Sequence, residues 1–128
     1  MQHYHYIFTG SGLSALMTVY EMILSKNFDD KSILLIDENP KKVNDRTWCF
    51  WSKETEPPYA SIVSRTWKKL KVISDTDVQH LKLNRYSYHL IRGIDFYTHA
   101  QKELKSDTRF EFVSDFILGI STVNSEAK

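Results

Sequence analysis

The sequence is short of the residues and runs that disulfides, membrane helices and nucleic-acid surfaces require. Its 128 residues contain one cysteine, Cys49, which excludes an internal disulfide and fits a reducing compartment. No apolar run approaches the roughly 20 residues of a membrane-spanning helix, and residues 1–5 are too polar for a signal peptide. The net charge of +1 argues against a nucleic-acid partner. We expect one modest cytoplasmic domain, and peripheral contact with the inner face of a membrane stays open.

Metal-binding and nucleophile patterns are also missing. The histidines show no metal-ligand spacing relative to Cys49, so we expect no metal site. They are His3, His5, His80, His89 and His99. Cys49 itself lies between aromatic residues, which favours a buried small apolar side chain over a reactive thiol.

What the sequence does contain is an ordered series of short apolar segments in its first 37 residues. Residues 4–9 (YHYIFT) predict a short strand, and residues 13–25 repeat apolar side chains at helical spacing. Residues 32–36 (SILLI) form a continuous apolar run, as expected for a strand covered on both faces. The series predicts a strand, a glycine turn, a helix and a second strand.

Behind this unit the pattern becomes richer in extended segments. In chain order we expect an irregular segment over 41–59, strands over 62–73 and 78–90, a helix over 95–105, and strands over 110–113 and 116–123. The parallel sheet then has only three candidate strands, 4–9, 32–36 and 110–113, which is fewer than a doubly wound sheet usually has. We therefore expect the chain to be the N-terminal piece of a longer protein.

The turn between the first strand and the helix, GSGLSA over residues 10–15, follows the G-x-G-x-x-G/A fingerprint of dinucleotide binding. Gly10 permits the tight turn, Gly12 lets a pyrophosphate approach the backbone, and Ala15 lets helix and strand pack closely. The phosphate charge would lie at the helix N-terminus, and Asp37 would accept hydrogen bonds from a ribose. The predicted cofactor-binding residues of this region are Gly10, Ser11, Gly12, Leu13, Ser14, Ala15 and Asp37.

The identity of the nucleotide is less constrained than its position. An acid at Asp37 argues against NADP, whose 2′-phosphate it would repel, while NAD, FAD and S-adenosylmethionine all remain open on physical grounds. A strand–helix turn that holds no nucleotide is the remaining alternative. A motif placed this close to Met1 is typical of flavoproteins with two dinucleotide-binding domains, and this analogy favours FAD.

The most unusual stretch is DRTWCFW, residues 45–51, which follows the glycine turn and an LLID strand. In that order these motifs resemble the lycopene cyclases, and above all the bacterial lycopene β-cyclase type. Residues 67–72 (WKKLKV) and the spacing of aromatic and charged residues over 86–96 are similar to that family too. The resemblance spans essentially all 128 residues.

Membership of that family implies an α/β, Rossmann-like FAD/NAD(P)-binding fold, incomplete here, with the start of an antiparallel substrate-domain sheet. The dinucleotide-binding part would comprise residues 1–45 and 91–128, and residues 58–90 would be a β-strand excursion of the substrate region. The implied reaction closes the linear ψ-ends of lycopene into β-rings, towards β-carotene, as an intramolecular lyase of the isomerase class. It would be non-redox acid–base chemistry on an apolar carotenoid, using reduced FAD with NAD(P)H as reductant. The catalytic residues are expected beyond Lys128, and the oligomeric state is not predicted.

The resemblance also implies roles for two arginines. Arg46 falls where related flavoproteins place an arginine near the flavin or its phosphates, and Arg92 where they often have another cofactor-contacting arginine. The charge of an arginine suits a pyrophosphate or an anionic reduced flavin. The alternative for each is a surface ion pair, for instance with Asp45 or Asp95.

Three aromatic residues of the same stretch are candidates for lining the substrate site. Trp48, Phe50 and Trp51 would give a polyene an apolar surface and would steady a carbocation through their ring faces. The alternative for all three is a core or domain-interface cluster.

Three other functions remain open. One is a different flavoprotein of the same superfamily, such as a monooxygenase or a polyprenyl reductase. Another is an NAD-dependent dehydrogenase, although further β-α-β units would then be expected where residues 62–90 predict strands. The last is a nucleotide-sensing or scaffold domain without catalysis.

Overall fold

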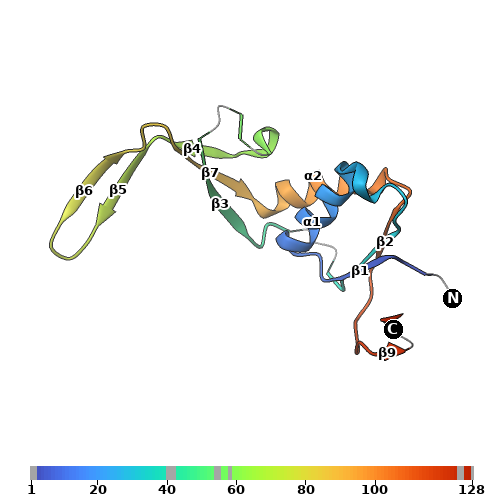
Figure 1. Ribbon diagram of the computed structural model, residues 1–128. Coiled ribbons are helices and arrows are strands. Elements are labelled where there is room, and N and C mark those ends of the chain that lie inside the picture. Colours follow the sequence, from blue (N-terminus) through green and yellow to red (C-terminus); the bar gives the residue numbers. More distant parts are fainter. Residues whose placement is uncertain (1–2, 40–42, 54–55, 58, 124–125, 128) are drawn as a thin grey trace. The chain divides into compact units, whose positions relative to one another are not determined.

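The chain is a mixed α/β protein with several small sheets (Figure 1). The computed structural model describes residues 3–39, 43–53, 56–57, 59–123 and 126–127. It divides into two units, Met1–Lys42 with Ala100–Lys128, and Val43–His99. Within the irregular segment expected over 41–59, residues 41–42, 54–55 and 58 lie outside the described residues. In the part of the chain that is described, no helix is long and apolar enough to cross a membrane.

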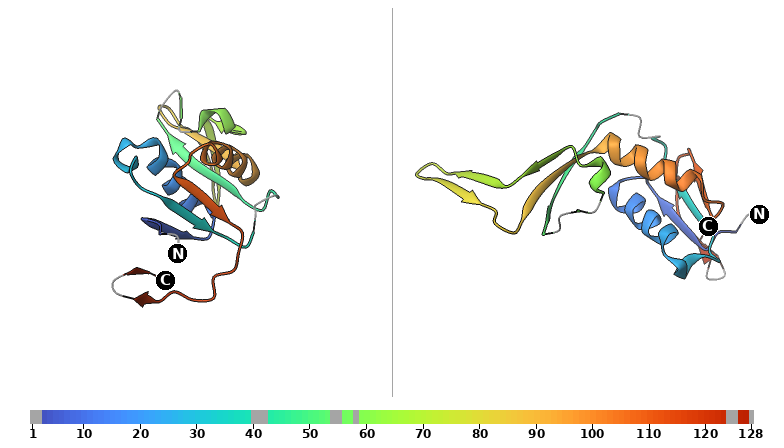
Figure 2. Two further views of the ribbon diagram at one scale, coloured as in Figure 1. Left: turned by 90° about the vertical axis from the view of Figure 1, so that its right-hand side faces the viewer. Right: turned by 90° about the horizontal axis from the view of Figure 1, so that it is seen from above.

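The first unit is built on a parallel sheet of three strands. They are β1 (Tyr6–Thr9), β2 (Ile33–Ile36) and β8 (Phe110–Val113), in the order β1-β2-β8 (Figure 2). The register places Phe8 beside Leu35 and Leu35 beside Phe112. The parallel sheet predicted from these three segments is confirmed. The chain between β1 and β2 forms helix α1 (Leu13–Leu24) and a short 3-10 turn, η1 (Lys26–Phe28).

The core of this unit explains its apolar sequence pattern. The central strand β2 is buried at Ile33, Leu34 and Leu35, so both of its faces are covered. Helix α1 buries one face through Leu16, Val19 and Met22, which follow each other at intervals of three residues. Helix α2 (Gly93–Lys105) contributes its C-terminal part to the core through two buried residues, Ala100 and Leu104.

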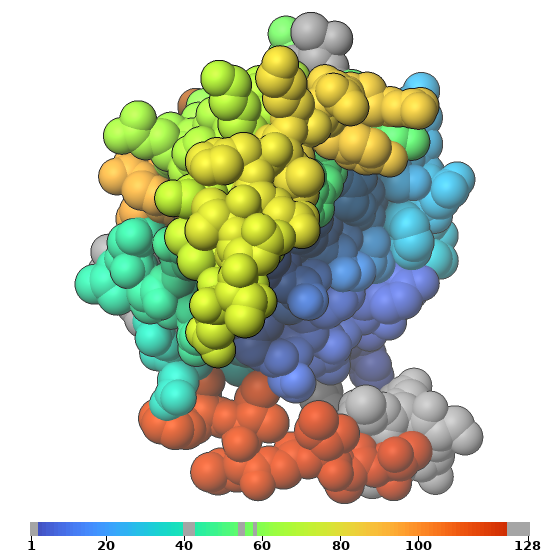
Figure 3. Space-filling model, turned by 90° about the vertical axis from the view of Figure 1, so that its left-hand side faces the viewer, coloured from blue at the N-terminus to red at the C-terminus, as the bar shows by residue number. Residues whose placement is uncertain are grey.

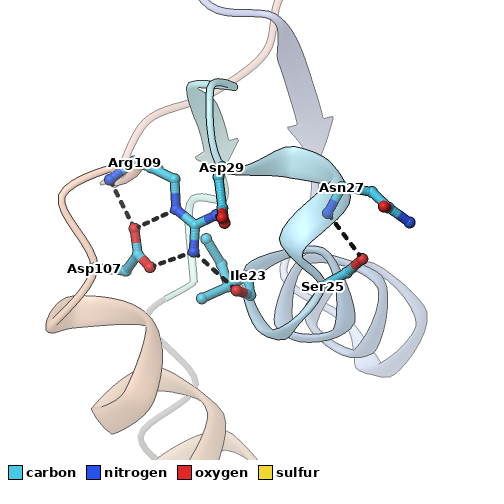
Figure 4. A network of polar contacts seen from close by, with 6 residues as sticks. All are labelled: Ile23, Ser25, Asn27, Asp29, Asp107 and Arg109. Atoms are coloured by element: carbon cyan, nitrogen blue, oxygen red, sulfur yellow. Dashed lines mark hydrogen bonds and ion pairs between the residues drawn. The ribbon is translucent and has the colours of Figure 1, made fainter.

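A guanidinium group secures the end of α1 (Figure 4). Arg109 Nη2 donates to the carbonyl oxygen of Ile23 at 2.8 Å, and Nη1 pairs with Asp29 at 2.8 Å. The Arg109 side chain also donates two hydrogen bonds to the Asp107 carboxylate, from Nε to Oδ1 at 2.9 Å and from Nη2 to Oδ2 at 2.7 Å. The last turn of α1 has no basic residue of its own, so Arg109 supplies the cation that a helix C-terminus favours. Its hydrogen bonds hold the pKa of the Asp107 carboxyl below its ordinary value.

The second unit is antiparallel. It contains β3 (Thr47–Ser52), η2 (Ala60–Ile62), β4 (Arg65–Trp67), β5 (Lys69–Ile73), β6 (Val78–Lys82), β7 (Ser87–Arg92) and the first residues of α2. One sheet has the order β3-β7-β4, and β5 pairs with β6 as a hairpin. Trp48 meets the rings of Phe96 and Tyr97 on α2 edge to face, at centroid distances of 5.6 and 5.4 Å.

Several element predictions were wrong in this region. Residues 47–52 were expected to be irregular, but they form β3, because their alternating side chains pair with β7 from a distant part of the chain. The expected strand over 62–73 is divided into β4 and β5, and its first residue, Ile62, is the last of η2. The expected strand over 78–90 is interrupted between β6 and β7, where Asn84 adopts a left-handed φ of 45°. Helix α2 begins at Gly93, two residues before its expected start.

The strand expected over 116–123 was also largely wrong. Only Thr122–Val123 (β9) is extended and paired, and its partner is β10 (Glu126–Ala127). Leu118 is 98% exposed. An apolar run without a neighbouring strand leaves its backbone groups to water, and therefore gains nothing from an extended sheet conformation.

Replacing Arg109 with methionine should lower the free energy of unfolding by about 1–3 kcal/mol at neutral pH, because several acceptors lose their charged donor. A carboxyl whose pKa is lowered in the folded state stabilises the fold at pH values above the ordinary pKa of that group. This contribution is lost as the pH falls through the lowered pKa. The difference between wild type and variant should therefore shrink below about pH 4. Urea unfolding at neutral and acidic pH measures both effects.

The matched control is Lys31→Met, which removes the exposed ion pair with Asp30 and should leave stability unchanged. A difference between wild type and Arg109→Met that stays the same at both pH values would contradict the role given to Asp107.

Candidate functional site

The glycine turn is attached to the ends of two parallel strands. Gly10 follows β1 with a φ of 88°, in the left-handed region that glycine adopts without a steric penalty. Its backbone N–H donates to the carbonyl oxygen of Ile36, the last residue of β2, at 2.7 Å. The turn therefore lies at the carboxyl edge of the sheet, where open α/β sheets bind their ligands.

The reason for a glycine at position 12 differs from the reason at position 10. Its φ of −68° suits any residue, and a Cβ placed on it would meet no atom within 4 Å. No neighbour among the described residues therefore requires a glycine here. Gly12 caps α1 without a side-chain hydrogen bond, and the first turn of α1 carries no acid. A backbone that is open to close approach, at a helix start without a side-chain cap, fits a pyrophosphate.

Asp37 is brought to the same turn from 26 residues along the chain. Its Oδ2 accepts hydrogen bonds from the backbone N–H of Ser11 and, at 2.7 Å, from the Ser11 hydroxyl. Its Oδ1 accepts the backbone N–H of Asn39 at 2.7 Å. These bonds hold the Asp37 carboxylate beside the glycine turn. Ser11, predicted only as one of the cofactor-binding residues of the turn, is fully buried and links the turn to the acid.

The remaining predicted residues of the turn lie in the first turn of α1. Leu13 and Ala15 are half-buried, while Ser14 is exposed. The Ser14 carbonyl accepts the Thr18 hydroxyl at 2.8 Å within the helix. Six consecutive residues and Asp37 thus form one continuous site in the first unit.

The two predicted arginines belong to the second unit. Arg46 is exposed, and its carbonyl oxygen accepts the backbone N–H of Gly93 at 2.7 Å. A Cβ on Gly93 would lie 2.8 Å from that oxygen, so this close approach requires glycine. Arg92 forms a bidentate ion pair with Asp95, with bonds of 2.6 and 2.7 Å, and lowers the pKa of that carboxyl. For Arg92 the structure therefore shows the surface ion pair that was the alternative.

The three aromatic candidates do not share one surface. Strand alternation places Trp48 and Phe50 on one face of β3 and Trp51 on the other. Trp48 is half-buried and packs against α2, whereas Trp51 is 50% exposed. Cys49 shares the face of Trp51 and is exposed, so the expectation of a buried thiol was wrong. Among the described residues, no group of three histidine, cysteine, aspartate or glutamate side chains is placed to hold a metal ion.

No protein-family model matches the chain, and no curated protein matches it. Among solved structures, a four-substitution mutant of P. aeruginosa PqsL is similar in fold, with a TM-score of 0.66. The two sequences are 12% identical, and the match covers 88% of this chain. The chain spans about a third of the length of the PqsL structure, since 33% of that chain is covered. A likeness at this level of identity concerns the fold alone.

These comparisons overturn the resemblance to lycopene cyclases. They give no evidence of a lycopene cyclase, and the structural neighbour PqsL is an FAD-dependent monooxygenase-like enzyme. The segment that suggested the resemblance, DRTWCFW, has a structural role instead. It forms β3, whose Trp48 packs against α2.

The two glycines of the turn should respond differently to alanine. Gly10→Ala should lower the free energy of unfolding by about 1–2 kcal/mol, because it forces an L-residue into a left-handed conformation. Gly12→Ala should leave stability unchanged, because its φ is ordinary and its Cβ meets no neighbour. Thermal unfolding of the two variants tests this contrast, and equal destabilisation would contradict it.

Proposed function

We propose that the glycine turn, the start of α1 and Asp37 form the ADP-binding corner of an FAD site. On this proposal the chain is the FAD-binding part of a flavin-dependent enzyme, with an incomplete Rossmann-like fold. The observation that carries the proposal is the pair of hydrogen bonds from Ser11 to Asp37, which puts a carboxylate beside the glycine turn. That is the arrangement in which one end of a dinucleotide meets both a ribose acceptor and a phosphate cradle.

Each part of the corner has a defined task in this proposal. The backbone N–H groups at the start of α1 would receive the pyrophosphate, and the open space over Gly12 would admit it. Asp37 would accept the ribose hydroxyls, with Ser11 holding the carboxylate in position. FAD, when bound, would supply a two-electron carrier that a nicotinamide cofactor reduces.

Two observations favour FAD over NAD, for which Asp37 would be equally suitable. After β2 the chain enters the antiparallel β3-β7-β4 sheet before it returns to the parallel sheet at β8, whereas a dehydrogenase would continue with β-α-β units. The fold is also similar to that of PqsL. Of the two flavoprotein alternatives, a monooxygenase is therefore the better supported reaction class, ahead of a polyprenyl reductase.

Calorimetric titration of the purified protein with ADP, FAD and NAD tests the proposal. FAD and ADP should bind saturably, and FAD should bind more tightly than NAD. Gly12→Val should weaken binding of both FAD and ADP by at least about tenfold, because its side chain would occupy the space left for the pyrophosphate. Asp37→Asn should weaken ADP binding by about tenfold, as expected for the loss of a charged hydrogen-bond acceptor.

Asp30→Asn is the matched control, since Asp30 is an exposed acid of the same unit that lies outside the turn. It should bind all three nucleotides as the wild type does. The proposal is wrong if ADP and FAD show no saturable binding, or if Gly12→Val binds them normally.

A further inference from the structure

The second unit has a hollow of its own at the base of the β5–β6 hairpin, with a volume of about 460 Å³. Its lining comes from β3, from the end of β6 and from the turn before β7, through Trp51, Leu81, Lys82, Leu83, Arg85 and Tyr86. The hairpin itself is exposed along its length, as its yellow and yellow-green atoms show in Figure 3. None of the lining residues belongs to the proposed nucleotide site.

The hollow presents aromatic and aliphatic surface to solvent. Trp51, Leu81 and Tyr86 are exposed by 50%, 43% and 39%. The Trp51 ring is supported by Tyr88 on the neighbouring strand at a centroid distance of 4.6 Å, and Tyr88 lies 5.9 Å from Trp67. This row across β3, β7 and β4 fixes the orientation of the Trp51 ring while leaving half of it uncovered. A surface of this kind, next to a concavity, is typical of a ligand site.

The charged side chains that line the hollow, among the described residues, are both cations. They are Lys82 and Arg85. Neither of these cations forms an ion pair with a described residue. A third cation, Lys53, places its Nζ 5.1 Å from the centre of the Tyr86 ring. Positive charge beside exposed rings selects a ligand with an apolar body and an acidic group.

The turn that carries Arg85 is held in place by the backbone. The Tyr86 N–H donates to the Leu83 carbonyl at 2.7 Å, and the Leu83 N–H donates to the Lys68 carbonyl at 2.9 Å. Asn84 takes the left-handed conformation that the turn needs, and asparagine tolerates it better than most residues. The lining is therefore formed before a ligand arrives, which reduces the entropy lost on binding.

We propose that this hollow binds a small aromatic anion, with the ring against Trp51 and Tyr86 and the acidic group facing Arg85 and Lys82. Its volume falls within the range of about 300–1,000 Å³ that is usual for small-molecule sites. The proposal does not depend on the FAD assignment, because it uses residues of the other unit only.

Calorimetric titration of the protein with 2-naphthalenesulfonate tests the proposal, with neutral 2-naphthylmethanol as the reference ligand. The sulfonate should bind at one site, more tightly than the alcohol, and its affinity should fall as salt is raised. Arg85→Gln and Lys82→Gln should each weaken sulfonate binding by about three- to tenfold and leave alcohol binding unchanged. Trp51→Leu should weaken the binding of both the sulfonate and the alcohol.

Lys71→Gln is the matched control, because Lys71 is an exposed lysine of the same hairpin that does not line the hollow. It should bind the sulfonate as the wild type does. The proposal is overturned if the sulfonate shows no saturable binding or binds no better than the alcohol. It is also overturned if Lys71→Gln weakens sulfonate binding as much as Arg85→Gln and Lys82→Gln do. Arg85, Lys82 and Lys71 are all exposed, so the three charge variants should fold. They test the proposal even if Trp51→Leu fails to fold.

Discussion

The parallel pairing of β1 with β2 is the constraint on which the candidate nucleotide site depends. Both strands end at the same edge of the sheet, so the turn after β1 and the acid after β2 meet there. The Gly10 N–H bond to Ile36 ties the start of the turn to the end of β2. The Ser11 bonds to Asp37 tie the next residue of the turn to the acid.

The same unit shows how charge completes what the helix lacks. Helix α1 has no acid in its first turn and no base in its last. At its C-terminal end Arg109, from the segment before β8, supplies the missing cation. At its N-terminal end Gly12 gives no side-chain cap, and the first turn carries no acid. This asymmetry has a simple physical meaning if the anion that completes the helix is the phosphate of a ligand.

In the second unit, the period of two along β3 separates residues that are neighbours in sequence. Trp48 packs against α2 and Trp51 faces solvent, so one aromatic stretch serves two purposes. Packing within the unit and the proposed contact with a ligand are thus tasks of different residues. An aromatic motif taken as a single unit conceals this division. DRTWCFW suggested one substrate-lining surface and a family that the comparisons do not support.

The sequence by itself determined the local elements whose signals are local. The apolar run of β2, the helical spacing of α1, the glycines of the turn and the acid of Asp37 were all visible in the residue order. Tertiary structure decided the rest, because it depends on pairing between distant segments. Only the β3–β7 register made residues 47–52 a strand and exposed Cys49, and only the approach of Arg46 to Gly93 set the start of α2. The hollow beside Arg85 likewise exists because β3 and the β6–β7 turn meet in space, which no single segment encodes.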